Sequence, residues 1–356
     1  MNNTQKSNRI ISYDILRIIA TLSIVMIHTA ASFVLSSPVG SFEFTVSNFI
    51  DSLARVGVPI FAMISGALML NENKKTSITD MLSHALKIFG LLLFWSLFYA
   101  VYYYIAIPII TSKPINIAAA FKAVIDGHYH FWFLYMLIGL YIVTPILRLF
   151  VKKENKKYIS YMLAIMVAVN FVAPFVNFFT KQYFMGGDSL LHYIEKFELP
   201  FSTGCLTYYI LGWYLTTFEI KKNRRTLIYV LGVVGFLSTF LCSQLLTTES
   251  VEAHGVFYSH NIINVFLHSV AIFVFVIYWS KDKDIKHKNA LVKISTTTFG
   301  IYIIHDITLR FVDALTLGLE NFFLRLMLNY LLTLGISFIC MYIISKIPII
   351  KKLIKG

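Results

Sequence analysis

Charged residues are scarce in this sequence, and their scarcity excludes an ordinary water-soluble globular protein. Asp, Glu, Lys and Arg make up only 14% of the 356 residues, against about 25% in a typical soluble domain. Hydrophobic residues make up 57%, and the mean hydropathy is +0.71. The surroundings of most of this chain are therefore lipid rather than water.

Cysteine is also sparse. Cys205, Cys242 and Cys340 each lie inside an apolar stretch, and none belongs to a Cys-X-X-Cys pair. A disulfide framework and a structural zinc site are therefore not expected. The formal net charge of +13 would suggest a nucleic acid partner in a soluble protein. Here most of the basic residues lie between the apolar stretches, where they orient a membrane protein instead, so no nucleic acid partner is expected.

Long apolar stretches recur along the whole sequence. A bilayer core needs about 20 mostly apolar residues per helix. Ten stretches qualify: 10–33, 46–70, 84–108, 130–151, 158–179, 198–219, 226–246, 259–280, 290–316 and 322–345. The sequence therefore predicts an all-α integral membrane protein with about ten transmembrane helices. We expect residues 1–356 to form a single polytopic domain.

The basic residues between these stretches alternate strongly from one loop to the next. One set of alternating loops carries twenty Lys and Arg residues, whereas the other set carries four. Loops rich in Lys and Arg stay on the cytoplasmic side of a membrane. This alternation supports the helix count and predicts that both termini are cytoplasmic.

Two ionisable residues of the first predicted helix, Arg17 and His28, share one face. They are eleven residues apart, and eleven steps of about 100° return to within about 20° of the same direction, ~16 Å further along the axis. Asp14 precedes Arg17 by three residues and can neutralise it. Ionisable groups inside a membrane are costly and usually mark a site or pathway. The alternative is an ion pair for packing together with a hydrogen-bonded core histidine.

The second predicted helix carries a deep arginine beside a proline. Arg55 lies roughly 14 Å from the outer end of the helix, at 1.5 Å per residue. Pro59 has no N–H group, so the carbonyl of Arg55 loses its helical partner and a kink is expected. Ser65 and Gly66 offer a small face for close helix contact. A kink beside a buried arginine is typical of a lined cavity, although a purely structural kink is the alternative.

Several polar residues are expected at the outer level of the membrane. His128, His130 and Trp132 begin the fourth predicted helix, and His305 lies in the ninth. Asp306 and Arg310 form an i,i+4 pair that we interpret as structural. One more carboxylate, Glu198, begins the sixth helix. Aromatic residues at this level also form ordinary interfacial belts, and the histidine spacing predicts no metal site.

These residues resemble those of the membrane acyltransferases called acyltransferase family 3. The most specific match is a basic residue, ten intervening residues and a histidine on helix one, here Arg17 and His28. Supporting matches are Asp14, the segment RVGVPIFAMISG at residues 55–66, FWFLYMLIGLYIVTPIL on helix four and FGIYIIH on helix nine. The resemblance covers the full length and is greatest for the type that acetylates enterobacterial common antigen.

The resemblance implies a reaction and a location. It implies an O-acetyltransferase in the bacterial cell membrane that takes the acyl group from cytoplasmic acetyl-CoA. The acceptor would be a hydroxyl of a cell-surface or lipid-linked glycan. Arg17, Arg55 and Lys87 would bind the donor, with Lys87 replacing an arginine-rich run that many members carry before a proline at the start of helix three.

The resemblance also suggests residue roles. His28, Arg17, Asp14 and Arg55 would be catalytic. His28 would act as a general base on the acceptor hydroxyl, or would accept the acyl group itself. Residues at the outer level would bind the acceptor: His128, His130, Trp132, Glu198 and His305.

Two other functions fit the same composition. A glycan-precursor transporter or flippase would also need about ten helices and buried charges, but the sequence shows no inverted repeat with paired interrupted helices. A receptor domain that binds acyl donors without turnover is the second alternative. Movement of a labelled acetyl group into a glycan or onto His28 separates the enzyme from both.

Overall fold

Every regular element that the structure describes is a helix. The structure is a computed structural model that describes residues 10–74, 76–183, 190–197, 203–248, 253–281, 283–344 and 346. Within these ranges there is no β-strand. The predicted all-α class is confirmed.

The first half of the chain runs from the central helix to the end of the fourth predicted span. Its elements are α1 (Ile11–Ser36), α2 (Phe42–Ala54), α3 (Gly57–Met69), α4 (Ile78–Val101), the π-helix η1 (Tyr102–Ala106), α5 (Ile107–Ile110), α6 (Ile117–Asp126), the 3-10 turn η2 (Tyr129–Phe131) and α7 (Trp132–Phe150).

The second half begins with another 3-10 turn and ends with a helical hairpin. Its elements are η3 (Lys153–Asn155), α8 (Lys156–Val167), the π-helix η4 (Ala168–Val172), α9 (Ala173–Tyr183), α10 (Leu190–Glu195), α11 (Gly204–Thr217), α12 (Lys222–Leu246), α13 (Ala253–Phe257), α14 (Ile263–Lys281), α15 (Lys288–Ser295), α16 (Thr298–Thr316) and α17 (Phe322–Ile344).

Eight helical segments within the described residues are long and apolar enough to cross a bilayer. They coincide with eight of the ten predicted spans. Of the other two, the sixth appears as the 14-residue α11. The ninth contains the 19-residue α16, which carries three charged residues. The integral membrane class is confirmed, whereas the count of ten and the cytoplasmic termini stay predictions.

The ninth predicted helix, 290–316, is wrong in one respect, because it is two helices. α15 ends at Ser295 and α16 begins at Thr298. Between them, the hydroxyl groups of Thr296 and Thr297 donate to the carbonyls of Lys293 and Ile294, both at 2.7 Å. Such local side-chain bonds compete with the helical ladder and accompany the break.

The predicted kink in the second span is present as a complete break. α2 ends at Ala54, and α3 begins at Gly57, just before Pro59. Arg55 lies at this break, where Pro59 removes the N–H that its carbonyl would have accepted from. The side chain of Arg55 is therefore presented from a helix end rather than from a continuous helix.

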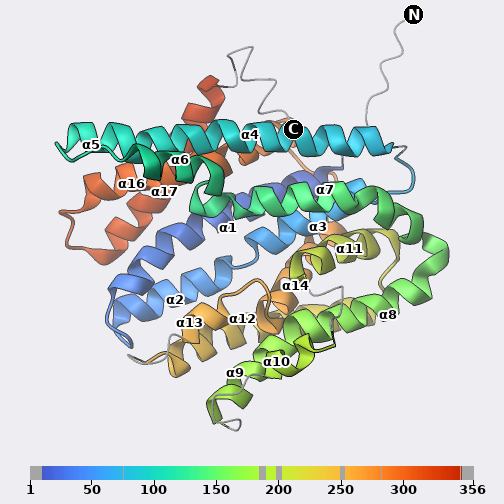
Figure 1. Cartoon of the computed structure of the whole chain (residues 1–356). Coiled ribbons are helices and arrows are strands. Elements are labelled where there is room, and N and C mark those ends of the chain that lie inside the picture. Colours follow the sequence, from blue (N-terminus) through green and yellow to red (C-terminus); the bar gives the residue numbers. More distant parts are fainter. Residues whose placement is uncertain are drawn as a thin grey trace, which may run out of the picture.

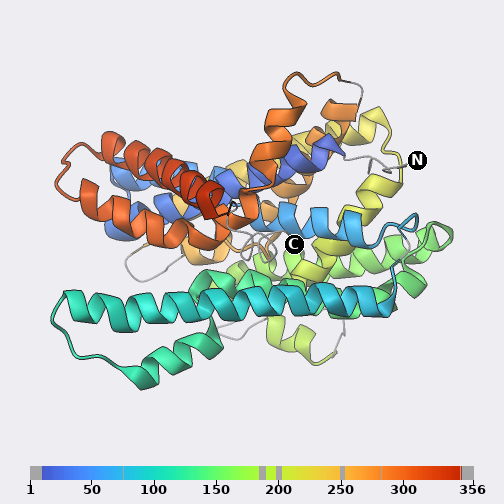
Figure 2. The same cartoon turned by 90° about the horizontal axis from the view of Figure 1, so that it is seen from above.

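α1 lies at the centre of the helix packing. It packs against α2, α3, α14, α15, α16 and α17, and α4 runs almost the full length of the molecule beside α7 (Figures 1 and 2). Two large buried clusters of hydrophobic side chains fill the spaces around α1 and α3. A residue on the inner faces of α1 is therefore reached by several helices at once.

The predicted small face of the second span is in close contact with α11. A Cβ atom added at Gly66 would lie 1.7 Å from the carbonyl oxygen of Tyr209, and one added at Gly212 would lie 2.0 Å from that of Met63. Only glycine permits backbones to approach this closely, as in other membrane helix pairs. This contact fixes the position of α3, and with it the position of Arg55.

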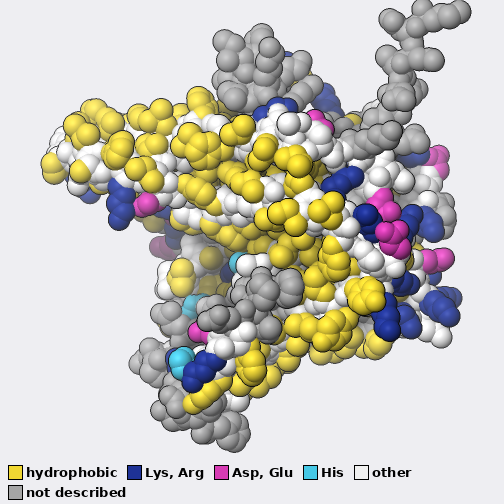
Figure 3. All heavy atoms as spheres, turned by 45° about the vertical axis from the view of Figure 1, so that its right-hand side comes forward, with side chains coloured by type: hydrophobic (Ala, Val, Ile, Leu, Met, Phe, Trp, Pro, Cys, Tyr) yellow, Lys and Arg dark blue, Asp and Glu magenta, His cyan; other side chains and the backbone are white. Residues whose placement is uncertain are grey.

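The two ends of the molecule differ in charge. Figure 3 shows Lys and Arg gathered with Asp and Glu at the end from which α4 and α8 start, and hydrophobic side chains along the flank formed by α4. At this end, Arg148 donates to the carbonyl of Met69 at 2.8 Å and ties α7 to the last residue of α3. The arrangement fits a basic cytoplasmic rim and a lipid-facing flank.

Candidate active site

One uninterrupted helix carries Asp14, Arg17 and His28, as the sequence predicts. Asp14 is fully buried, and its carboxylate accepts from Arg17 at 3.3 Å and from the hydroxyl of Ser295 at 2.6 Å. Arg17 keeps 31% of its side chain exposed. The buried carboxylate holds the guanidinium of Arg17 in place on the same helix as His28.

The four predicted histidines come together at the other end of α1. The ring of His28 lies 5.0 Å from that of His305 on α16 and 6.5 Å from that of His130 at the start of α7. The rings of His130 and His305 are 4.9 Å apart, and those of His128 and His130 are 5.0 Å apart. Three separate segments thus contribute imidazoles to one cluster.

Local structure positions the two histidines that precede α7. Gly127 ends α6 with φ of +74° and ψ of 166°, a region that is essentially restricted to glycine. His128 then precedes the 3-10 turn η2, which carries Tyr129 and His130, so three consecutive ring-bearing side chains lie here. The hydroxyl of Tyr302 donates to the carbonyl of His130, which fastens this turn to α16.

Asp306 lies at the centre of the hydrogen bonds around this cluster, and its sequence interpretation as one half of a structural pair is incomplete. The pair with Arg310 is present, with Nε donating at 3.1 Å. The same carboxylate also accepts from His128 Nε2 at 2.8 Å and from the hydroxyls of Tyr103 and Tyr129, both at 2.9 Å. Its side chain is only 3% exposed, so four donors stabilise one buried negative charge.

The hydrogen bonds of Tyr129 determine which nitrogen of His28 is available. The single phenolic hydrogen donates to Asp306, and the phenolic oxygen lies 3.2 Å from Nδ1 of His28. That oxygen must therefore accept, so Nδ1 of His28 carries the hydrogen. The lone pair of a neutral His28 then resides on Nε2, the state that a general base or nucleophile requires.

Two more nitrogens of the cluster are left without partners. His305 donates from Nδ1 to the carbonyl of Tyr302 at 2.6 Å, and His130 donates from Nε2 to that of Ile303 at 3.2 Å. The remaining nitrogens, His305 Nε2 and His130 Nδ1, are buried and have no hydrogen-bond partner within the described residues. Unsatisfied buried acceptors are costly and often mark functional sites. Donors on a bound substrate would satisfy them.

Arg55 lies close enough to the cluster for its charge to act on one of its histidines. It pairs with the fully buried Asp51 and lies over the ring of Tyr258, 4.1 Å from its centroid. Its charge acts on His28 and on His260. His260, in the connection before α14, stacks on Trp132 with ring centroids 4.8 Å apart. Burial, with a smaller contribution from Arg55, lowers the pKa of His260 to about 4, so this ring is neutral near pH 7.

Of the two remaining predicted site residues, only Lys87 lies within the described residues. Lys87 is exposed on α4. Glu198 lies outside the described residues. No group of three or more His, Cys, Asp or Glu within the described ranges is arranged to hold a metal ion.

Sequence reasoning missed Tyr103 and Tyr129, and it understated Asp306. Tyr129 lies between the two histidines of the segment HYH, which was the available signal. Nothing in the sequence indicated Tyr103. It reaches Asp306 from η1, a π-helical turn of the kind that is frequent at functional sites.

A half-buried histidine that bonds to a tyrosine, which in turn bonds to a buried carboxylate, inside a bundle of membrane-spanning helices defines a polytopic membrane protein with a polar site in its interior. The sequence also matches a family model described as an acyltransferase domain, acyltransferase family 3, over residues 10–346. The chain therefore belongs to this family and is a membrane acyltransferase. No curated protein and no solved structure matches it.

Proposed function

We propose that this protein is an O-acetyltransferase that moves an acetyl group from cytoplasmic acetyl-CoA to a hydroxyl of a cell-surface or lipid-linked glycan. The observation that carries the proposal is the arrangement of His28, Tyr129 and Asp306, which leaves a lone pair on Nε2 of His28. Membership of the family supports acyl transfer as the reaction class. The acetyl donor and the glycan acceptor follow from the residue resemblance.

In the direct route, His28 acts as a general base. Nε2 takes the proton of the acceptor hydroxyl while the hydroxyl oxygen bonds to the thioester carbonyl carbon. The carbon–sulfur bond then breaks, and the imidazolium returns the proton to the leaving thiolate of CoA. The products are an acetyl ester and free CoA, so atoms and charges balance.

In the covalent route, Nε2 of His28 attacks the thioester carbonyl carbon, and the carbon–sulfur bond breaks. CoA leaves as the thiolate and takes a proton from water, while the acetylated imidazole keeps its hydrogen on Nδ1. The acceptor hydroxyl then attacks the acetyl carbonyl and loses its proton to water, which releases neutral His28. This route allows the donor to depart before the acceptor arrives, which suits substrates that approach from opposite sides of a membrane.

The other end of α1 fits the donor. Asp14 holds Arg17 partly exposed on the same helix as His28, on the side that the charge alternation assigns to the cytoplasm. A positive group there attracts the phosphates of CoA, as does the basic rim. Lys87, exposed on α4, belongs to the same proposal. The extended pantetheine arm would carry the thioester along α1 toward His28.

Arg55 fits a role in charge stabilisation. Its guanidinium is held by Asp51 and Tyr258 at the helix break, within electrostatic reach of His28. A positioned cation lowers the energy of the oxyanion that forms when the thioester is attacked. His128, His130 and His305 belong to the histidine cluster, and Trp132 stacks on His260. With Glu198 they are the proposed acceptor contacts.

The proposal includes a bacterial cell-membrane location and an acceptor of the enterobacterial-common-antigen type. The rival function is a glycan flippase, which also fits a polar site inside a membrane bundle. A flippase needs no lone pair on a fixed histidine, however, and the hydrogen bonds of Tyr129 provide one.

Transfer of label from radioactive acetyl-CoA is the direct test. The full-length protein in membranes is incubated with the donor, and label is followed into glycan and into protein. We expect label in a glycan ester with wild type and its loss with His28→Ala at equal protein level. Full labelling with His28→Ala would overturn the catalytic assignment. Glycan movement across the membrane without acetyl transfer would favour the flippase.

The acceptor is identified by comparing surface glycans from cells with and without the gene by NMR. We expect one O-acetyl resonance to disappear and to return with wild type, but not with His28→Ala.

A further inference from the structure

A cavity of about 490 Å³ is lined by Tyr129, whose ring contacts that of His28, whereas His28 itself does not line the cavity. α4, η1, α6, η2 and α16 surround it. Its walls include Tyr99, Tyr103, Tyr104, His128, Tyr129 and Arg310. Binding cavities for small organic ligands span about 300–1,000 Å³ and combine aromatic walls with a few placed polar groups. This cavity has that size and that composition.

The aromatic walls are held rigidly. The ring of His128 stacks against those of Tyr99 and Tyr103, with centroid distances of 4.2 Å and 5.3 Å. Tyr99 donates to the carbonyl of Ile303 at 2.8 Å, and Tyr103 donates to Asp306. Tyrosine offers an apolar ring with a polar tip, which matches a sugar ring with its apolar faces and its rim of hydroxyls.

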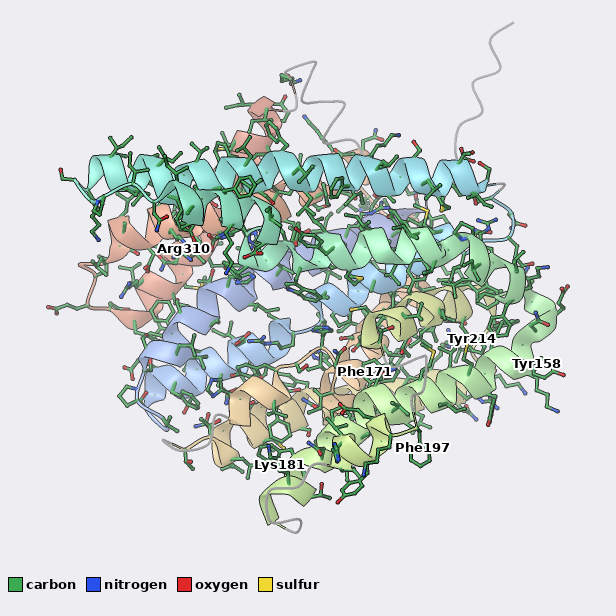
Figure 4. All side chains as sticks on the ribbon, viewed as in Figure 1. Tyr158, Phe171, Lys181, Phe197, Tyr214 and Arg310 are labelled. Atoms are coloured by element: carbon green, nitrogen blue, oxygen red, sulfur yellow. The ribbon has the colours of Figure 1, made fainter. Side chains whose placement is uncertain are left out.

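Arg310 gives the cavity a positive wall. Its Nε atom is engaged by Asp306, and the guanidinium lies 5.3 Å from the ring centroid of Tyr103. Its two terminal nitrogens have no hydrogen-bond partner in the part of the chain that the structure describes, and 55% of the side chain is exposed. Figure 4 shows Arg310 on α16 near α6, at the end of the molecule opposite Tyr158 and Tyr214. A guanidinium held by one edge presents the other edge to an anion.

We propose that this cavity binds an anionic sugar residue of the acceptor, with the ring against the tyrosines and the carboxylate or phosphate on Arg310. The inference rests on the proposed function and adds to it the chemical class of the acceptor. Tyr129 separates the cavity from His28, so the sugar bound here is a neighbour of the one that is acetylated. The acceptor is therefore longer than a monosaccharide.

Binding to the full-length protein in zwitterionic lipid nanodiscs tests the inference independently of catalysis. The probe is a tetrasaccharide of alternating glucuronate and N-acetylglucosamine, and the matched probe is its carboxyl methyl ester. Calorimetry measures the dissociation constants. We expect the ester to bind about tenfold more weakly or worse, because it loses a charge-assisted pair. Equal affinity for the two probes would overturn the proposal.

Substitutions in the cavity wall test whether the tetrasaccharide binds in this cavity. We expect Arg310→Gln to weaken the binding of the acidic tetrasaccharide about tenfold. We expect Tyr104→Ala to weaken its binding as well. The controls are Arg325→Gln, an arginine paired with Asp313 outside the cavity, and Tyr161→Ala, an exposed tyrosine on α8. Losses equal to those of the controls would overturn the proposal. Thermal melting of each variant shows whether the fold is intact.

Two further arms distinguish the source of the negative charge. If glucose 1-phosphate binds and Arg310→Gln weakens its binding, the natural ligand is a sugar phosphate. If only the acidic tetrasaccharide binds, the natural ligand is a uronate. If neither probe binds, and phosphatidylglycerol in the disc shifts the melting temperature through Arg310 alone, the residue contacts a lipid headgroup and the proposal fails. If the wild-type protein binds the tetrasaccharide but shows no acetyl transfer, the proposed function is wrong and the assignment of the cavity still holds.

Discussion

The phenolic oxygen of Tyr129 joins His28 to Asp306, at 3.2 Å from Nδ1 of the histidine and 2.9 Å from the carboxylate. The phenol donates in one direction and accepts in the other. It therefore fixes both the orientation and the hydrogen position of the imidazole. In a serine hydrolase the histidine bonds directly to the aspartate. Here a tyrosine lies between the histidine and the aspartate and bonds to both.

Tyr129→Phe removes this link and keeps the ring. Nδ1 of His28 loses its acceptor, so the imidazole no longer has one preferred tautomer. We expect a fall of about 10–100-fold in kcat for acetyl transfer, the scale seen when supporting hydrogen bonds are removed. Steady-state kinetics on reconstituted protein measures it.

Tyr135→Phe is the matched control for that experiment. Tyr135 lies on α7 and donates to the carbonyl of Ile125, away from His28. Its loss is expected to leave kcat within about twofold of wild type, because it changes no contact of the cluster. Equal effects of the two substitutions would refute the linking role of Tyr129.

Asp306→Asn replaces a carboxylate that four donors surround with an amide that carries its own hydrogens. At least one donor then faces the amide nitrogen, and Arg310 loses its counter-charge. Removing one partner of a buried pair costs about 3–5 kcal/mol, and the partial exposure of Arg310 places this case at the lower end. We expect a lower melting temperature and loss of acetyl transfer.

Asp313→Asn provides the comparison. Asp313 also pairs with an arginine, but 41% of its side chain is exposed. Exposed pairs contribute about 0–1 kcal/mol, so its melting temperature should fall less. If Asp313→Asn destabilises as much as Asp306→Asn, burial is not what gives Asp306 its importance.

Much of this site follows from the sequence for a simple physical reason. Arg17 and His28 are on one helix, so their relation depends on helical geometry alone, and Pro59 marks the break at Arg55 through chemistry local to the chain. Tyr129 and Asp306 are 177 residues apart. Their contact depends on how α7 and α16 pack. No periodicity of a single sequence contains that information, and so Asp306 was assigned only to its i,i+4 neighbour.

Two substitutions of Arg17 distinguish the effect of its charge from the effect of its planar guanidinium geometry. Arg17→Ala removes the group proposed to meet the CoA phosphates and takes the ion-pair partner Arg17 away from the buried Asp14. Arg17→Lys keeps the charge but not the planar fork. We expect the KM for acetyl-CoA to rise with both variants, and much more with alanine, if charge is what matters. An equal loss with lysine would indicate bidentate recognition.

The contact between α3 and α11 gives a prediction about folding. Gly66→Ala places a methyl group where the carbonyl oxygen of Tyr209 lies 1.7 Å away, so the two helices must separate. Overpacking of this kind costs about 1–3 kcal/mol or more, and we expect a clear fall in melting temperature in detergent. Gly90→Ala is the control, because a Cβ atom there meets nothing within 4 Å.

Moving α3 also displaces Arg55, which directly precedes it. Any Gly66→Ala protein that still folds should therefore lose acetyl transfer, while Gly90→Ala keeps it. A folded and fully active Gly66→Ala protein would show that Arg55 does not depend on this contact for its position.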